Sequence, residues 1–249
     1  IFSVAYNMLL GQTGLLSFGH AIYFGLAGYA SIHFLSGVNN NYLPSLPLPI
    51  LPFIGAFIGL ILGISIGYLS TKRIGTAFAM ISLGFCELIT ALTLIFVVFF
   101  NGEDGIQADR VLGNEFLGFT YGPQYEVYYL ILFWCIFAVA IMYFLTKTPF
   151  GRMCNAVRDN QQRAEFVGYD VRKIRWMAFS LSAMFAGAAG SLHAISEESV
   201  LEKRGGEGEG AEPFPGAAFM GVVGGVGWPW RPVACAGAVG VSTWSSLLT

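Results

Sequence analysis

The chain has 249 residues, of which 55% are hydrophobic and 11% are charged, and its formal net charge is −2. Soluble domains carry roughly 25% charged residues, so this composition excludes an ordinary soluble domain and is typical of a membrane protein. The small net charge gives no indication of nucleic-acid binding. The cysteines and histidines are scattered, with neither a CxxC pair nor an HExxH motif, so we predict no metal site.

Long uncharged runs predict transmembrane helices, because about 20 apolar residues cross the hydrocarbon core of a bilayer and a helix satisfies its own backbone there. In chain order the predicted spans are 1–11 (incomplete), 14–35, 49–69, 76–100, 127–145 and 177–195, with a weaker pair at 217–227 and 233–249. The chain begins within an apolar segment without Met or a basic leader, so we interpret it as a fragment. The expected fold class is all-α, a polytopic transmembrane helix bundle forming a single domain of residues 1–249.

The first distinctive stretch, residues 11–30 (GQTGLLSFGHAIYFGLAGYA), combines irregularly spaced glycines with polar side chains. Glycine-interrupted segments of transporters often unwind near the bilayer centre and expose backbone donors to a substrate. A break in which Ser17 starts a new helix would direct free N–H groups at an anion such as a carboxylate. A short-looped helical hairpin explains the same residues. The candidate substrate-pathway residues in this stretch are Gln12, Gly14, Ser17, His20 and Gly25.

Small residues recur at helical spacing in two spans. Such stripes let helices approach closely in lipid, so we expect both spans to pack inside the bundle. The stripe of the span 49–69 consists of Gly55, Gly59, Gly63 and Gly67. The span 177–195 has two ridges, one of Ser182, Ala186, Gly190 and Ala194 and the next of Ala183, Gly187 and Ser191.

Glu87 is an acid well inside the span 76–100, in the sequence SLGFCELIT. An intramembrane carboxylate is a functional candidate by default, and we add Glu87 to the candidate substrate pathway. Because no other span offers an obvious basic partner, a protonated, hydrogen-bonded structural role explains it equally well.

The connecting segments alternate in charge. Residues 70–75 carry Lys72 and Arg73 without an acid, and 146–176 carry seven basic residues against three acidic ones. Residues 101–126 and 196–216 are instead predominantly acidic. Cytoplasmic loops are enriched in Lys and Arg, so the first two segments are predicted to be cytoplasmic and the other two to lie outside.

Residues 149–167 are predicted to form one cytoplasmic helix, since Thr148 is a plausible N-cap, Pro149 suits the first position and Gly168 suits the end. An i, i+4 pair of Asp159 and Arg163 would support it. At 100° per residue the expected apolar face comprises Met153, Ala156, Val157, Asn160, Ala164 and Val167. The expected polar face comprises Arg152, Asn155, Asp159, Gln162 and Arg163.

Phe166 falls on the polar side of this helix, where it would either anchor in a partner's pocket or lie on the membrane surface. Asp170 is expected to cap a second helix that leads into the next span. A basic amphipathic helix that simply lies on the membrane is the alternative interpretation of the whole segment.

Five stretches in series resemble the permease subunits of the bacterial branched-chain amino acid ABC importer family, the high-affinity leucine, isoleucine and valine uptake type. The similarity follows the family's order from residue 1 to about 198. The stretches are NMLLGQTGLLSFGHAIYFGLAGYA, GTAFAMISLGFCELI (75–89), NGEDGI (101–106), TPFGRMCNAVRDNQQRAEFVGYDV (148–171) and AFSLSAMFAGAAGSLHA (178–194).

This resemblance implies a permease that is not itself an enzyme, in the bacterial inner membrane, with several partners. They are a second permease subunit, two cytoplasmic ATPases that carry ATP and Mg, and a periplasmic substrate-binding protein. It also implies that the segment 146–176 is the ATPase-coupling loop, with Ala164, Glu165 and Gly168 at the positions of the loop's small residue, acid and glycine. The remaining candidate coupling residues are Arg152, Arg158, Asp159 and Phe166. No lysine follows a glycine, so a phosphate-binding GxxxxGK[ST] loop is absent and we expect no cofactor on this chain.

The chain departs from the family pattern after Ser199. An apolar run is expected there, whereas the sequence reads VLEKRGGEGEGAEPFPG, within an atypical polar stretch at 197–216. A shifted reading frame and an unusual insertion are both hypotheses for this stretch. The family's last spans are also expected beyond Thr249.

The nearest alternative to an importer of branched-chain or related small amino acids is a related importer of urea or short amides. A secondary transporter would need ion-coupling acids, for which Glu87 alone qualifies. A membrane-embedded enzyme would need clustered Asp, His or Ser/Lys residues within the spans, and the sequence offers no such cluster.

Overall fold

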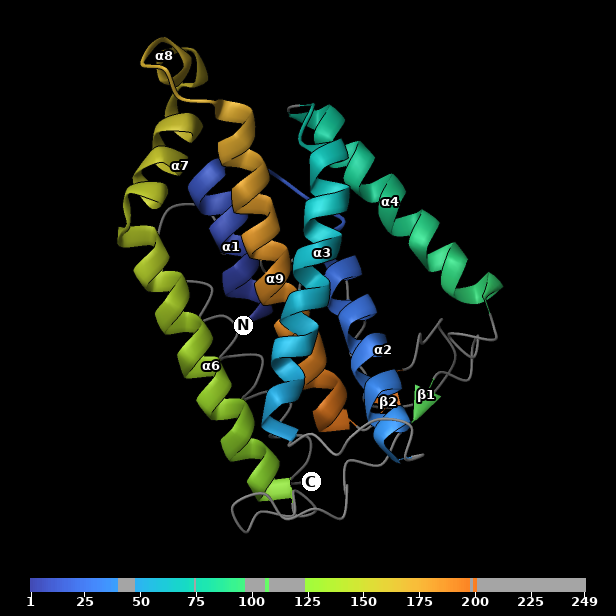
Figure 1. Ribbon diagram of the computed structural model, residues 1–249. Helices are drawn as coiled ribbons and strands as arrows, with labels where there is room; N and C mark the ends of the chain where they lie inside the picture. The colour runs from blue at the N-terminus through green and yellow to red at the C-terminus, as the bar shows by residue number, and fades with distance from the viewer. Residues whose placement is uncertain (40–47, 74, 97–105, 108–123, 198, 201–249) are drawn as a thin grey trace, which may run out of the picture.

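The computed structural model describes residues 1–39, 48–73, 75–96, 106–107, 124–197 and 199–200 (Figure 1). The helices are α1 (Phe2–Thr13), α2 (His20–Asn39), α3 (Leu51–Ser70), α4 (Thr76–Ile95), α6 (Gln124–Lys147), α7 (Pro149–Asp159), α8 (Gln161–Phe166) and α9 (Val171–Glu197), and a 3₁₀ turn covers Leu48–Ile50. Two short strands, β1 (Ile106–Gln107) and β2 (Ser199–Val200), pair antiparallel. The predicted spans at 217–227 and 233–249, and nearly all of the polar stretch 197–216, lie outside the described residues.

The all-α fold class is confirmed. Within the described ranges, five helices are long and apolar enough to cross a membrane: His20–Val38, Leu48–Ser70, Thr76–Thr93, Tyr125–Lys147 and Val171–Ser196. They correspond to the predicted complete spans, but their bounds differ. Helix α2 begins at His20 rather than at residue 14, α4 ends at Ile95 rather than at residue 100, and α9 begins at Val171 rather than at residue 177.

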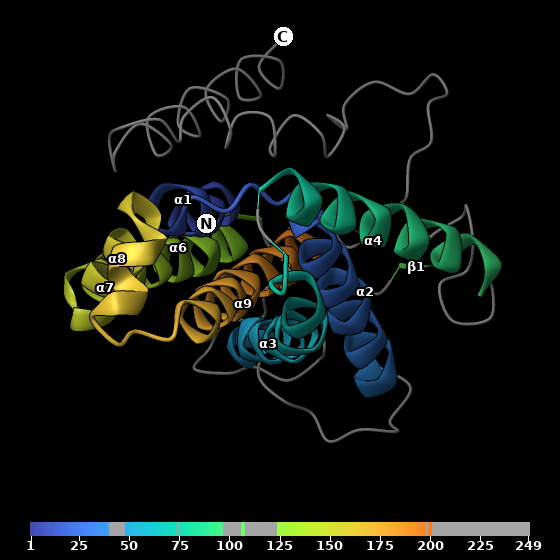
Figure 2. The ribbon, with the colours of Figure 1, turned by 90° about the horizontal axis from the view of Figure 1, so that it is seen from above.

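Helix α9 occupies the centre of the bundle. Seen from above, it lies between α3, α2, α1 and α6, while α4 lies at the edge (Figure 2). Most of α9 is buried, whereas α4 and α6 expose large apolar side chains along much of their length. Burial on every side explains why α9 carries two ridges of small residues, because each ridge faces a different neighbour.

The glycine stripe of α3 packs directly on the α9 ridge of Ala183, Gly187 and Ser191, so both spans lie inside the bundle as predicted. All four glycines of the stripe are buried. A Cβ added at Gly59 would lie 2.5 Å from the carbonyl oxygen of Ala183, and one at Gly55 would lie 2.6 Å from the side chain of Ser191. The two backbones therefore lie too close for any side chain larger than hydrogen at these positions of α3.

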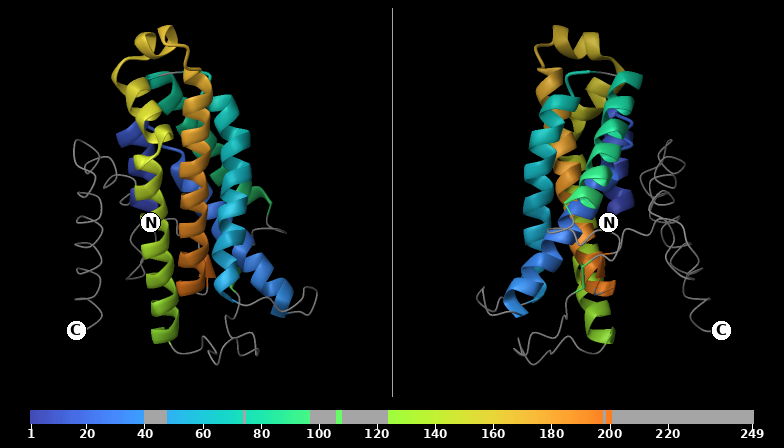
Figure 3. Two further views of the ribbon diagram at one scale, coloured as in Figure 1. Left: turned by 60° about the vertical axis from the view of Figure 1, so that its left-hand side comes forward. Right: turned by 90° about the vertical axis from the view of Figure 1, so that its right-hand side faces the viewer.

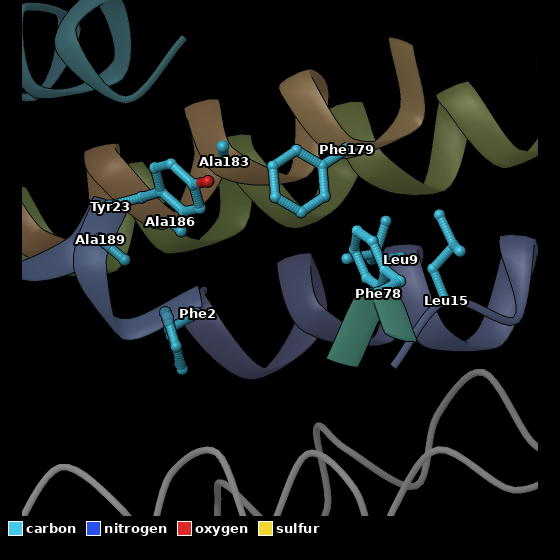
Figure 4. Packing of buried hydrophobic residues seen from close by; sticks show 9 residues of the cluster. All are labelled: Phe2, Leu9, Leu15, Tyr23, Phe78, Phe179, Ala183, Ala186 and Ala189. Carbon is cyan, nitrogen blue, oxygen red and sulfur yellow. The ribbon is translucent and has the colours of Figure 1, made fainter. Parts of the chain in front are cut away.

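The other ridge of α9, which consists of Ser182, Ala186, Gly190 and Ala194, faces α1 and α2. A Cβ at Gly190 would collide with the backbone of Phe24 in α2. Ser182 Oγ donates a hydrogen bond to the carbonyl oxygen of Ala5 in α1, at 2.5 Å. Around these contacts, residues of α1, α2, α4, α9 and the segment between α1 and α2 form one apolar cluster (Figure 4). It consists of Phe2, Leu9, Leu15, Tyr23, Phe78, Phe179, Ala183, Ala186 and Ala189.

The connections sort to the two ends of the bundle as their charges predicted. The turn between α3 and α4, with Lys72 and Arg73, lies at the same end as α7 and α8 (Figures 1 and 3). At the opposite end Ile106 pairs with Val200, so the described parts of the two predominantly acidic connections lie side by side. The structure therefore confirms which connections share an end.

Candidate functional site

Helices α1 and α2 are separated by a break at residues 14–19. Gly14 ends α1 in the left-handed conformation, with φ 68° and ψ 17°, and its N–H donates to the carbonyl of Leu10 at 3.0 Å. A residue with a Cβ strongly disfavours this conformation, so the glycine sets the end of the helix. An interruption is present, as both the transporter-type break and the short-looped hairpin require, and the new helix begins at His20, three residues later than Ser17.

The break is held against helix α4. The N–H of Phe18 donates to Ser82 Oγ at 3.1 Å, and a Cβ at Gly19 would lie 2.5 Å from the carbonyl oxygen of Ser82. Leu15 packs with Phe78 in the cluster of Figure 4. Ser82 has no periodic or motif signal, so sequence reasoning missed its role.

His20 is buried at the start of α2 and joins three helices. Its Nε2 lies 2.7 Å from Ser182 Oγ in α9, and that hydroxyl donates its own proton to the carbonyl of Ala5 in α1. Nε2 must therefore carry the hydrogen and donate, which leaves Nδ1 as an acceptor in the neutral ring. The rings of Tyr6, Tyr23 and Phe179 contact the imidazole edge to face, with centroids 5.4–5.7 Å away.

Three polar atoms around the break are buried without a hydrogen-bond partner among the described residues. They are Gln12 Oε1, Ser17 Oγ and His20 Nδ1. An unpaired buried polar atom costs about 1–3 kcal/mol, and each such atom calls for an explanation such as a ligand. All three belong to the predicted substrate pathway.

Gly25 and Glu87, the remaining predicted pathway residues, differ in their surroundings from the residues of the break. Gly25 in α2 is half-buried and has open space where a Cβ would project. Glu87 is exposed on α4, while the side of α4 that packs against the break is that of Phe78 and Ser82. The structure therefore places Gln12, Gly14, Ser17 and His20 in or beside the break and Glu87 on an exposed face of α4.

The predicted single helix 149–167 is wrong: the segment forms two helices. Helix α7 ends at Asp159, Asn160 is extended (φ −157°, ψ 107°), and its side chain caps α8 by accepting from the N–H of Arg163 at 3.1 Å. Asn is among the best N-cap residues, so this signal was present in the sequence. Thr148 holds the N-cap position of α7, but its hydroxyl donates to the carbonyl of Leu145.

The break at Asn160 changes both faces of the predicted helix. Cys154, Val157 and Ala164 are buried against Val171, Ile174 and Ala178, whereas the predicted apolar residues Ala156, Asn160 and Val167 are exposed. Asp159 pairs with Arg158 at 3.1 Å, because the helix needed for the i, i+4 pair with Arg163 does not continue.

Helix α8 and the turn after it form an exposed tip at the basic end of the bundle (Figure 3). Phe166 is 89% exposed and Val167 is 74% exposed. The tip ends at Gly168 with φ 96°, as the predicted stop requires, and Asp170 caps α9 by accepting from the N–H of Lys173 at 3.2 Å. Of the candidate coupling residues, Arg152 and Glu165 are exposed like Phe166, whereas Ala164 is buried.

Arg158 contacts helix α1, although its side chain remains 44% exposed. Its Nη1 donates to the carbonyl of Gly11 in the last turn of α1 at 2.5 Å. The sequence placed Arg158 among the coupling residues but gave no indication of this contact, which joins positions 147 residues apart.

Comparisons with known proteins agree with this architecture. The family described as "Branched-chain amino acid transport system / permease component" matches residues 1–248. The high-affinity branched-chain amino acid transport system permease protein LivM of Escherichia coli (strain K12) is 26% identical over 220 residues, which are 79% of this chain and 50% of that protein.

Two proteins of Methanocaldococcus jannaschii are also similar. A probable branched-chain amino acid transport permease protein LivM is 22% identical over 231 residues (81% of this chain, 65% of the relative), and a probable LivH is 30% identical over 164 residues (63% and 50%). The chain spans about half the length of the E. coli relative, and no solved structure matches it. With a family match over nearly its whole length, the chain belongs to the permease components of branched-chain amino acid transport systems and is a multi-pass membrane protein.

Proposed function

We propose that this chain is a membrane-spanning subunit of an ATP-driven ABC importer, which translocates branched-chain or related small amino acids across a bacterial inner membrane by alternating access. The observation that carries the proposal is the exposed α8 tip. It presents an aromatic and apolar surface at the basic end of a transmembrane helix bundle. Family membership supports it.

The break between α1 and α2 is the proposed substrate pathway. Gln12 Oε1 and His20 Nδ1 are acceptors and Ser17 Oγ is both donor and acceptor, so together they suit the ammonium and carboxylate groups of an amino acid. The cluster of Leu, Phe and Ala side chains beside them suits an aliphatic side chain. Glu87 remains a candidate pathway residue on α4.

The α8 tip is the proposed contact with an ATPase subunit. Two ATPases, a second permease subunit and a periplasmic binding protein would complete the importer. Closure of the ATPases on ATP would displace α7 and α8, and the bundle would shift between outward-open and inward-open states. ATP and Mg would be held by the ATPases.

Vesicle uptake tests this function. The permease is reconstituted with the ATPases and binding protein proposed as its partners, and uptake of leucine, isoleucine, valine, urea and acetamide is measured. We expect ATP-dependent uptake of the amino acids that requires both partners. Uptake driven by an ion gradient without ATPases would contradict the proposal, and preferred uptake of urea or acetamide would contradict its substrate.

The aromatic tip provides a sharper test of the coupling surface. Phe166→Ala should weaken docking of the ATPases by about 2 kcal/mol, roughly 30-fold, because exposed aromatics at such tips act as anchors. Substrate-stimulated ATP hydrolysis should fall with it. Tyr125→Ala is the matched control, since Tyr125 is also an exposed aromatic (64%) but lies on α6 at the opposite end. Equal effects of the two substitutions would remove the assignment.

A further inference from the structure

The Arg158 guanidinium closes the end of helix α1. The last four carbonyls of an α-helix lack an intrahelical partner, and in α1 Gly11 is one of the four residues that carry them. Nη1 of Arg158 donates to this carbonyl, while Nε and Nη2 hold Asp159 Oδ1 at 3.2 and 3.1 Å. A cation at this position also interacts favourably with the negative end of the helix dipole.

The same side chain contacts the first residue of the break. A Cβ at Gly14 would lie 3.1 Å from Arg158 Cγ, so the aliphatic stem of Arg158 covers this glycine. Gly14 is also the residue whose φ of 68° turns the chain out of α1. Arg158 therefore contacts α1 immediately before and at the point where the break begins.

Helix α7, which carries Arg158, is fixed to α6 and α9. Gly151 lies so close to the backbone of Thr146 that any side chain would collide with it, which ties α7 to the end of α6. Cys154 and Val157 are buried against Ile174 and Ala178 of α9. A displacement of the α8 tip would therefore move α7 as a packed unit, and Arg158 is a charge-assisted link from that unit to α1.

We propose that Arg158 is a positioning residue that transmits movement of α7 and α8 to the break at residues 14–19, by holding the C-terminal end of α1 to α7. The role assigned to it is thus a contact within the permease, whereas the sequence had placed Arg158 among the residues that contact the ATPase. This inference rests on the proposed function, because an ATPase must supply the movement. A guanidinium suits the task since one planar fork serves both Gly11 and Asp159.

Hydrogen exchange of the reconstituted importer tests the link. Exchange is measured at residues 11–19 and at residues 161–169, with and without a non-hydrolysable ATP analogue. In the wild type we expect the analogue to change exchange at both segments. In Arg158→Ala the change at 161–169 should persist and the change at 11–19 should be lost, with substrate transported per ATP falling about fivefold or more. A role in fold stability alone would alter both segments together.

Two further variants keep the test decisive. Arg73→Ala, an exposed arginine at the same end of the bundle, should leave transport per ATP and both exchange responses unchanged. Arg158→Lys, which keeps one donor and loses the fork, should give an intermediate loss, and it decides the question if Arg158→Ala does not assemble.

Two results would overturn the inference. One is an ATP response at residues 11–19 that survives in both Arg158 variants, and the other is an Arg73→Ala variant that loses this response as Arg158→Ala does. Failure of the proposed function is distinguishable, because the wild type itself would then show no ATP-dependent uptake and no response at 161–169.

Discussion

Burial of Cys154 between α7 and α9 raises the pKa of its thiol to about 12, because the thiolate would lose its hydration there. At pH 8 the thiolate, which is the reactive form, is then only about one part in ten thousand. In a variant whose single cysteine is Cys154, maleimide labelling should be slower by about a thousandfold than for an exposed thiol.

The chain offers a matched control for this prediction on the same helix. Ala156 is exposed, so a cysteine-free variant carrying Ala156→Cys should label rapidly, and its rate should level off above pH 9 while that of Cys154 continues to rise. Denaturation should make the two rates equal. Rapid labelling of Cys154 in the folded protein would contradict the packing of α7 on α9.

Single residues were predictable where one residue type is required by the backbone. Gly168 was predicted as a helix end and has φ 96°. Contacts between residues far apart in the sequence could not be predicted. The roles of Ser82, Ser182 and Arg158 depend on which helices become neighbours, and no spacing pattern in the sequence indicates those neighbours.

At the scale of elements, the α3–α9 interface depends on the absence of side chains. Gly59→Ala would place a Cβ 2.5 Å from the carbonyl oxygen of Ala183, so the helices must separate. We expect a loss of about 1–3 kcal/mol in the free energy of unfolding, measured by denaturant titration in detergent micelles.

Gly84→Ala in α4 is the control, since no atom lies within 4 Å of the added Cβ. Alanine is about 1 kcal/mol better than glycine in a helix, so this variant should be as stable as the wild type or slightly more stable. A neutral Gly59→Ala would mean that α3 and α9 do not meet through this stripe.

The α7–α8 corner makes a second prediction about an element. Asn160→Ala removes the cap of α8 and should cost about 1 kcal/mol locally, seen as faster hydrogen exchange at residues 161–166. Asn160→Asp preserves the acceptor and should leave exchange unchanged. If both variants exchange like the wild type, the cap does not hold the corner.

This corner also explains why the helical-wheel prediction was wrong. The wheel assumes that residues 149–167 share one axis, whereas the cap at Asn160 starts a new one. The glycine stripes succeeded because α3 and α9 are uninterrupted over their whole contact. Periodicity is thus informative within a helix and loses its meaning across a break.

For the whole molecule, the two ends of the bundle give an orientation prediction. Single cysteines at Lys72 and Gln162, both exposed at the basic end, should react with an impermeant reagent in inside-out vesicles. A cysteine at Tyr125, at the other end, should react in intact spheroplasts, because basic connections stay in the cytoplasm. The opposite pattern, or Lys72 and Gln162 on different sides, would contradict this topology.

The five spans within the described ranges and the ends that their connections share could be predicted, because lipid imposes length, apolarity and charge asymmetry on each segment alone. The burial of α9 could be predicted, since its ridges of small residues indicate close neighbours. Its central place could not be predicted, because the ridges do not identify which helices those neighbours are. The two-residue β1–β2 pair lies in connections that carry no membrane signal.

The contact between α3 and α9 also has a consequence for biosynthesis. Helix α3 ends at Ser70 and α9 begins at Val171, 101 residues later. At about 5–20 residues per second, the ribosome completes α3 roughly 5–20 s before it begins α9. During that interval the groove along Gly55, Gly59 and Gly63 faces lipid chains or the insertion machinery, so the centre of the bundle is assembled late, when α9 enters between helices already in the membrane.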